Sequence, residues 1–136
     1  MDQPNSTMAQ QVAQAAIAFE QRQTGRVPKS VTVVLSGETL VITLHDVLSP
    51  AEKAMAESPQ GAAQFQEFQR QLFANSSDWL RQEIKRITGV EVREAVAEIE
   101  PTSGTVVKVF TTGTVVQVFL LARGVPEDTW SRSKGG

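Results

Sequence analysis

A β-hairpin is predicted by the sequence Val31-Thr-Val-Val-Leu-Ser-Gly-Glu-Thr-Leu-Val-Ile-Thr-Leu44. Two alternating apolar runs, Val31–Leu35 and Thr39–Leu44, flank Ser36-Gly37, a pair that suits a two-residue turn. Alternation then places the apolar side chains on one face and a more polar set, which includes His45, on the other. The predicted register pairs Val33 with Leu40 and Val31 with Ile42.

Helices are predicted on both sides of this hairpin by their capping residues. Upstream, Thr7 and Gln10 have the spacing of a capping box, and an apolar stripe at helical spacing runs from there to Gly25. Downstream, Ser49-Pro50-Ala51-Glu52 forms a second capping box and begins a short helix that ends near Glu57.

A long helix is predicted from about Gly61 to Thr88, with Ser58 as a candidate cap and Gly89 at its end. Such a helix is about 40 Å long at 1.5 Å per residue, longer than a small domain is wide. We therefore expect one end to project, or the helix to kink at Asn75-Ser76-Ser77-Asp78. The apolar residues predicted on one side are Phe65, Phe68, Leu72, Trp79, Leu80, Ile84 and Ile87.

The last third of the chain is predicted to be rich in β-structure. Val90–Glu100 is predicted as a strand with a bulge near Arg93-Glu94. The repeated segments Gly104–Phe110 and Gly113–Phe119 predict a second hairpin that turns at Thr112-Gly113. Its predicted register pairs Val109 with Val116 and Val107 with Val118.

Both faces of this second hairpin are apolar in that register, so both need cover. The long helix covers one face, and a second protomer is expected on the other. The sequence therefore predicts a homodimer. The predicted oligomer interface consists of Val106, Phe110, Val115 and Phe119.

Composition limits the function classes. The 136 residues suit one domain, and 13 basic against 15 acidic residues argue against a nucleic-acid partner. The chain has no cysteine and one histidine, which excludes thiolate sites and any site that needs two imidazoles. No apolar run reaches the length of a membrane span, and residues 1–11 lack the pattern of a signal peptide. We expect a cytoplasmic protein without direct membrane insertion, metal or other cofactor.

The predicted fold class is α+β, with two layers: an antiparallel sheet of four or five strands and helices packed on one face. Residues 6–122 are expected to form a single domain. Residues 1–5 and 123–136 are expected to be flexible tails, with Trp130 solvated rather than docked.

Candidate chemistry is sparse. We interpret His45 as a surface strand residue rather than a catalytic base. A catalytic role would need Asp46 or another carboxylate to orient it and a serine nearby, and nothing in the sequence places these groups in an elbow or beside an oxyanion hole. Glu94, Glu98 and Glu100 are interpreted as a solvated strand face rather than a cation site. The one ligand hypothesis with a mechanism is an anion at the helix starts. Its candidate residues are Ser49, Ser58, Lys53, Arg26 and Lys29.

Three motifs resemble a known family. Gly25-Arg-Val-Pro28, Leu48-Ser-Pro-Ala-Glu-Lys53 and Arg70-Gln-Leu-Phe73 occur in its order and spacing, and the match covers roughly Val12 to Val96. The chain resembles the MpsC-like family, named for one component of a proposed sodium-translocating membrane-potential-generating system. Family members usually carry an aspartate-containing loop where this chain has Glu100-Pro-Thr-Ser-Gly104.

The resemblance implies a small cytoplasmic protein associated with membrane proteins for inorganic-carbon uptake, and it supplies no catalytic residues. The leading hypothesis is a non-enzymatic interaction or regulatory protein, homo-oligomeric, which docks on a partner such as a membrane transport protein. The alternative is a sensor of a small anion, bicarbonate or phosphate, bound at a helix N-terminus. An enzyme is disfavoured because acid–base groups are few.

Overall fold

The computed structural model describes residues 6–94, 107–109 and 115–131. Several predictions therefore lie outside the described residues: the tails 1–5 and 132–136, the strand beyond Glu94, the turn at Thr112-Gly113, and the positions of Val106 and Phe110. The elements, in chain order, are α1 (Met8–Thr24), β1 (Ser30–Ser36), β2 (Thr39–His45), α2 (Pro50–Ala56), α3 (Pro59–Thr88), β3 (Val92–Glu94), β4 (Val107–Val109), β5 (Val115–Leu121) and α4 (Glu127–Ser131).

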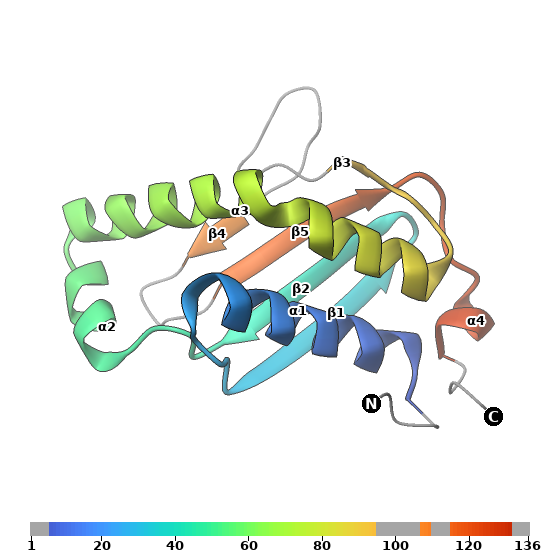
Figure 1. Ribbon diagram of the computed structural model, residues 1–136, viewed down its shortest axis with the longest axis horizontal. Helices are drawn as coiled ribbons and strands as arrows, with labels where there is room; N and C mark the ends of the chain where they lie inside the picture. The colour runs from blue at the N-terminus through green and yellow to red at the C-terminus, as the bar shows by residue number, and fades with distance from the viewer. Residues whose placement is uncertain (1–5, 95–106, 110–114, 132–136) are drawn as a thin grey trace.

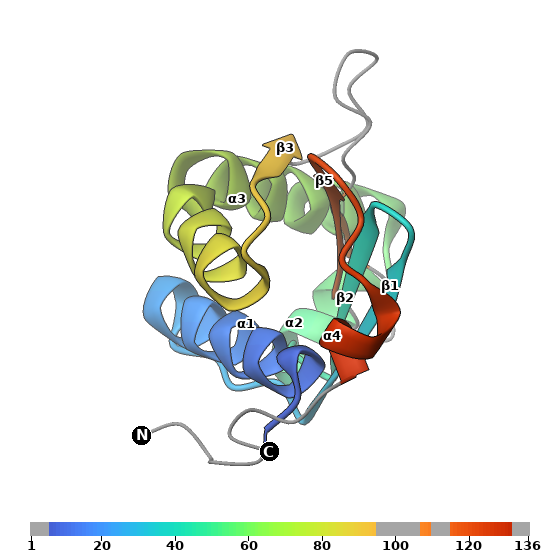
Figure 2. The same ribbon diagram turned by 90° about the vertical axis from the view of Figure 1, so that its right-hand side faces the viewer.

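The predicted α+β architecture is confirmed. The strands form one open antiparallel sheet in the order β1-β2-β5-β3, and β4 pairs with the same edge of β5 as β3 does. Helices α1 and α3 lie side by side on one face of this sheet (Figure 2). The two layers enclose the core.

The capping predictions are confirmed because the side chains close the expected hydrogen bonds. Thr7 and Gln10 cap α1, Ser49 and Glu52 cap α2, and the Ser58 hydroxyl accepts from the Gly61 N–H at the start of α3. α1 and α3 end at Gly25 and Gly89, which have φ of 76° and 75°. The backbone of α3 is helical through residues 75–78, and its axis changes direction near the middle (Figure 1).

For the first hairpin, the prediction of which side chains share a face is confirmed, but the predicted register is wrong. Val33 pairs with Ile42 and Val31 with Leu44, so the turn is Gly37-Glu38 rather than Ser36-Gly37. Gly37 takes φ of 60° at the first central position, where a turn of type II′ carries glycine. The register differs by two residues, and an even shift leaves every side chain on its predicted face.

For the second hairpin, both the predicted register and the predicted sharing of faces between the two strands are wrong. Val109 pairs with Val115, and Lys108 pairs with Val116, a shift of one residue that exchanges the two faces of β5. Val115 and Phe119 are completely buried beneath the helices of the same chain, so neither lies on an oligomer interface. The repeat suggested a symmetric pairing, but β5 is the central strand and its register must also suit β2. The outward residues of β5 are Val116, Val118 and Leu120.

The bulge predicted near Arg93-Glu94 is confirmed by the pairing of β3 with β5. Val92 pairs with Leu121 and Glu94 with Leu120, so the register shifts between Val92 and Glu94. This short strand, which follows α3 in the chain, pairs with β5 and forms an edge of the sheet.

The C-terminal segment packs on the domain instead of forming a flexible tail. Val125 is 9% exposed, and the Trp130 side chain, on α4, packs against the core. The predictions of a flexible tail and a solvated Trp130 are therefore wrong for residues 125–131. Burial of Val125 and partial burial of Trp130 explain why this segment is held against the domain.

The side chain of Gln117 is among the polar groups that are buried in the described structure. Gln117, in the middle of β5, is 1% exposed, and within the described structure neither atom of its amide has a hydrogen-bond partner. A buried amide without partners lowers stability, because its hydration is lost without replacement. We expect Gln117→Met to raise the free energy of unfolding by about 1 kcal/mol.

Urea unfolding of the wild type and Gln117→Met tests this expectation. Gln82→Met is the matched control, because Gln82 is an exposed residue of α3. This substitution should change stability by no more than about 0.5 kcal/mol. A less stable Gln117→Met variant would show that the amide makes a stabilising contact.

Candidate functional site

The residues predicted for an anion site lie around α2. Two of the cations among them, Arg26 and Lys53, already form ion pairs with carboxylates. The Arg26 guanidinium lies 2.9 Å from Glu52 Oε2 and 3.4 Å from Glu20 Oε2. The Glu20 side chain is completely buried and also accepts from the Thr24 hydroxyl at 3.0 Å. Arg26 therefore joins the end of α1 to the start of α2.

The other predicted anion ligands are similarly occupied, apart from Lys29. The Lys53 ammonium forms an ion pair with Asp46, and the Lys29 charge acts on the same carboxylate. The Ser58 hydroxyl accepts from Gly61 N–H and donates to the Met55 carbonyl. The structure brings the predicted residues together, but as a network that closes the α1–α2 corner. It gives the anion hypothesis no support.

Two of the three carboxylates of this corner, Asp46 and Glu52, favour their charged forms. The hydrogen bond from Lys53, together with its charge, holds the pKa of Asp46 below its ordinary value of 3.8. Burial acts to raise the pKa of Glu52, but hydrogen bonds from Ser49 and the charge of Arg26 outweigh it, and the pKa lies below 4.5. Ionised carboxylates therefore stabilise the fold.

This arrangement predicts a loss of stability in acid. A carboxyl whose pKa is lowered by folding contributes stability above its unfolded pKa, and the contribution disappears as the pH falls through the folded pKa. We expect the free energy of unfolding to fall below about pH 4.5, and to fall less steeply in Glu52→Gln. Denaturant unfolding between pH 3 and 7 measures this. Glu57→Gln, at the other end of α2, should keep the wild-type slope, and an unchanged slope in Glu52→Gln would contradict the prediction.

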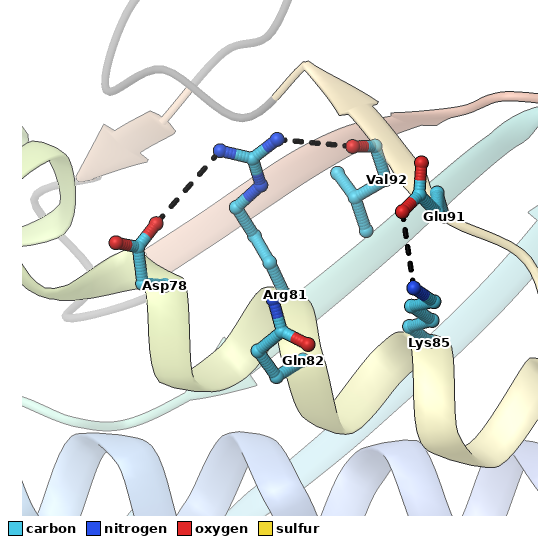
Figure 3. Close-up of a pocket in the computed structure, with 6 residues that line it drawn as sticks. All are labelled: Asp78, Arg81, Gln82, Lys85, Glu91 and Val92. Carbon is cyan, nitrogen blue, oxygen red and sulfur yellow. Dashed lines mark hydrogen bonds and ion pairs between the residues drawn. The ribbon is translucent and has the colours of Figure 1, made fainter.

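A polar pocket of about 280 Å³ lies between α3 and the segment that leads into β3 (Figure 3). The Arg81 guanidinium reaches across it, donates to the Val92 carbonyl at 3.0 Å and faces Asp78 at 3.9 Å. Lys85 Nζ lies 3.0 Å from Glu91 Oε1. These contacts fasten the short β3 strand to α3, so we interpret the pocket as structural.

An apolar groove lies where α2 meets the first half of α3. It has a volume of about 310 Å³ and is lined by Arg26, Glu52, Met55, Gln64, Phe65 and Phe68. Met55 and Phe68 are 53% and 49% exposed. The corner is tight, because a Cβ on Gly61 would lie 1.9 Å from the Met55 carbonyl oxygen.

The prediction that all apolar residues of the long helix share one side missed this groove. Phe73, Leu80, Ile84 and Ile87 face the core, whereas Phe68 is half exposed. At 3.6 residues per turn, Phe68 lies roughly a third of a turn away from the centre of the core-facing set, so spacing alone would have revealed two rows. Met55 and Phe68 line the same groove because the chain turns sharply between α2 and α3. No pattern among neighbouring residues predicts this contact.

The outer face of the sheet, opposite α1 and α3, has no helix of the described structure upon it (Figure 2). Val34 is 52% exposed there, and His45 Nε2 lies 2.9 Å from the Thr32 hydroxyl. This confirms that His45 lies on the more polar face. In the described part of the chain, no three carboxylate or imidazole side chains gather as metal ligands.

The described helices include none that is both long and apolar enough to cross a membrane.

The fold and its surface define a small α+β protein in which helices cover one face of an open antiparallel sheet, with an apolar groove at one corner. The chain belongs to the MpsC family: the family model, described as Na⁺-translocating membrane potential-generating system (MpsC), matches residues 5–114. This confirms the resemblance in the three sequence motifs. Comparison with curated proteins gave no match, and comparison with solved structures gave none either.

Proposed function

We propose that this chain is a non-enzymatic, cytoplasmic interaction protein that works as a homo-oligomer, in its simplest form a dimer. It docks on a membrane protein of an inorganic-carbon or ion transport system. The observation that carries the proposal is the apolar groove between α2 and α3. Exposed apolar surface of this kind is typical of protein–protein contacts.

The distribution of exposed apolar side chains supports this. Four large apolar side chains are exposed in the described residues. Met55 and Phe68 line the groove, Val27 follows the groove residue Arg26 in the chain, and Val34 lies on the sheet. Family membership supports the membrane system as the context, since the family description names a Na⁺-translocating assembly.

Sedimentation velocity tests the oligomer. At micromolar and higher concentrations we expect a species of twice the 14.8 kDa chain mass. A monomer throughout the concentration range would contradict this part of the proposal.

A pull-down tests the docking. The tagged chain is captured from a detergent-solubilised native lysate, with the tag alone as control. We expect a membrane transport protein in stoichiometric amount. Recovery of nothing but the chain itself would contradict docking.

The proposal also assigns the chain no catalytic role. The His45 side chain is hydrogen-bonded to a threonine on the outer face of the sheet and does not line the groove. Any turnover that is lost in His45→Gln, with unchanged thermal stability, would contradict this assignment.

A further inference from the structure

We propose that two copies of this chain pair edge to edge through β1, antiparallel about a two-fold axis at Val33, so that their two sheets become one. The inference rests on the proposed function, because it assigns a surface to the homo-oligomer, and it leaves the α2–α3 groove to the membrane partner. Three features of the described residues carry it: an edge strand without protection, a strand sequence that matches itself, and opposite charges at the two ends of that strand.

The two edges of the sheet differ in their protection against further pairing. Natural sheets block their edges with short strands, bulges, charged residues or proline. At one edge, β3 and β4 are three residues long, carry Arg93, Glu94 and Lys108, and include the register shift of β3. At the other edge, β1 has seven residues without charge or proline, and its pairs with β2 run without a shift. Within the described structure β1 pairs with β2 alone and is the outermost strand on its side (Figure 1).

The backbone of β1 presents hydrogen-bonding groups along this edge. Residues of an antiparallel pair alternate between those that bond to the neighbouring strand and those that do not, and a two-residue turn is closed by a bonded pair. The turn of the first hairpin makes Ser36 and Thr39 that pair, so Val31, Val33 and Leu35 direct their N–H and C=O groups away from β2. An extended strand is the partner that satisfies such a row of alternating donors and acceptors.

The apolar layer beneath the helices is incomplete at the same edge. The inner apolar residues of β2 are completely buried, whereas those of β1 are only partly buried. The three on β1 are Val31, Val33 and Leu35. A strand added beside β1 removes more of their surface from water, provided that its own inner residues are apolar.

The sequence of β1 supplies such a strand, because it reads alike in both directions. In Ser30-Val-Thr-Val-Val-Leu-Ser36, positions equally distant from Val33 match in character: serine with serine, valine with leucine, and threonine with valine. Antiparallel pairing about Val33 therefore sets inner apolar residues beside inner apolar residues, and outer beside outer. The inner residues are also those whose backbone groups face the open edge, so one register satisfies both. A second copy thus provides the self-match that an isologous contact requires.

Charged residues at the ends of β1 complement one another in this register. Lys29, exposed just before β1, lies opposite Gly37 of the other copy and beside its Glu38. Gly37 also lines a hollow of about 350 Å³, to which α4 contributes Glu127. Each end of the paired strands therefore brings a lysine of one copy toward carboxylates of the other. We expect salt to weaken the association modestly, because these charges are exposed.

The size of the contact sets its strength. The seven residues of β1 are about 24 Å long at roughly 3.4 Å per residue. A contact along one strand buries less than the roughly 800 Å² per partner of a standard interface. The dimer should therefore dissociate on dilution in the micromolar range.

Two double variants test the edge and the register together. In the proposed register, residue 32 of one copy lies opposite residue 34 of the other on the outer face. Thr32→Lys/Val34→Lys places like charges in both of these pairs, whereas Thr32→Glu/Val34→Lys places opposite charges there. We expect the dimer dissociation constant of the first variant to be about tenfold higher than that of the second, as measured by sedimentation velocity. Thr32 and Val34 are exposed, so both variants should fold, which circular dichroism and thermal melting check.

The outcomes separate this inference from the proposed function. Equal dissociation constants in the two variants, beside a wild-type dimer, would overturn the pairing through β1 and leave the homo-oligomer intact. A wild-type monomer at every concentration would overturn both. Docking on the membrane protein is read separately from the pull-down, because neither variant changes a residue that lines the α2–α3 groove.

Amide hydrogen exchange measures the pairing without any substitution. The N–H groups of Val31, Val33 and Leu35 should exchange slowly at concentrations where the chain is dimeric and fast where it is monomeric. Those of Thr32 and Val34 face β2 and should be protected at both concentrations, which makes them the internal control. A dimer in which the first three groups exchange as fast as in the monomer would overturn the inference.

Discussion

Replacing Arg26 with methionine is expected to lower the free energy of unfolding by about 3 kcal/mol. Glu20 is completely buried, and the Arg26 guanidinium lies 3.4 Å from its carboxylate. Removing one member of a buried ion pair costs about 3–5 kcal/mol, because the remaining charge stays desolvated. The low end applies here, because Arg26 is 17% exposed and water partly screens the pair.

A double-mutant cycle separates this mechanism from simple loss of packing. Glu20→Gln removes the buried charge, so Arg26→Met should cost much less in the Glu20→Gln background than in the wild type. Urea unfolding of the four proteins gives the coupling energy. Additive effects of the two substitutions would show that the ion pair does not carry the stability.

This pair also shows why the sequence did not reveal that two cations of the predicted anion site are already paired with carboxylates. Arg26 and Lys53 were selected as cations near helix starts, and they do lie there. Their partners Glu20 and Asp46 lie six and seven residues away in the chain, at separations without a fixed helical or strand geometry. Only the folded corner shows that the charges are compensated.

Features set by a few neighbouring residues could be predicted from the sequence. The caps at Thr7, Ser49 and Ser58 depend on side chains within three residues of the helix start, and all three form. The bulge near Arg93 came from a break in alternation within one strand. In each case the physical cause is local.

Features that depend on distant partners could not be predicted. The register of β5 is set by β2 as well as by β4, so the internal repeat alone gave the wrong pairing. Val125 and Trp130 looked like tail residues because their burial requires the core to exist first. The groove likewise needs α2 to turn back onto Gly61.

Replacing Phe73 with alanine is expected to lower the free energy of unfolding by about 4 kcal/mol. Phe73 is completely buried and packs edge-to-face on Phe19 of α1, with ring centroids 6.2 Å apart. Its ring also lies 5.5 Å from that of Phe119 in β5. One side chain therefore joins both helices to the central strand, and its loss leaves a cavity that three elements line.

Phe68→Ala is the matched control, because it removes the same side chain from the same helix at a position that is 49% exposed. Measured by urea unfolding at concentrations where the chain is monomeric, it should change stability by less than about 1 kcal/mol. The contrast follows from burial, since only Phe73 is surrounded by groups that cannot collapse into the space it leaves. Equal losses in the two variants would mean that Phe68 is packed inside the monomer, which would contradict its place as an exposed ring on the apolar groove.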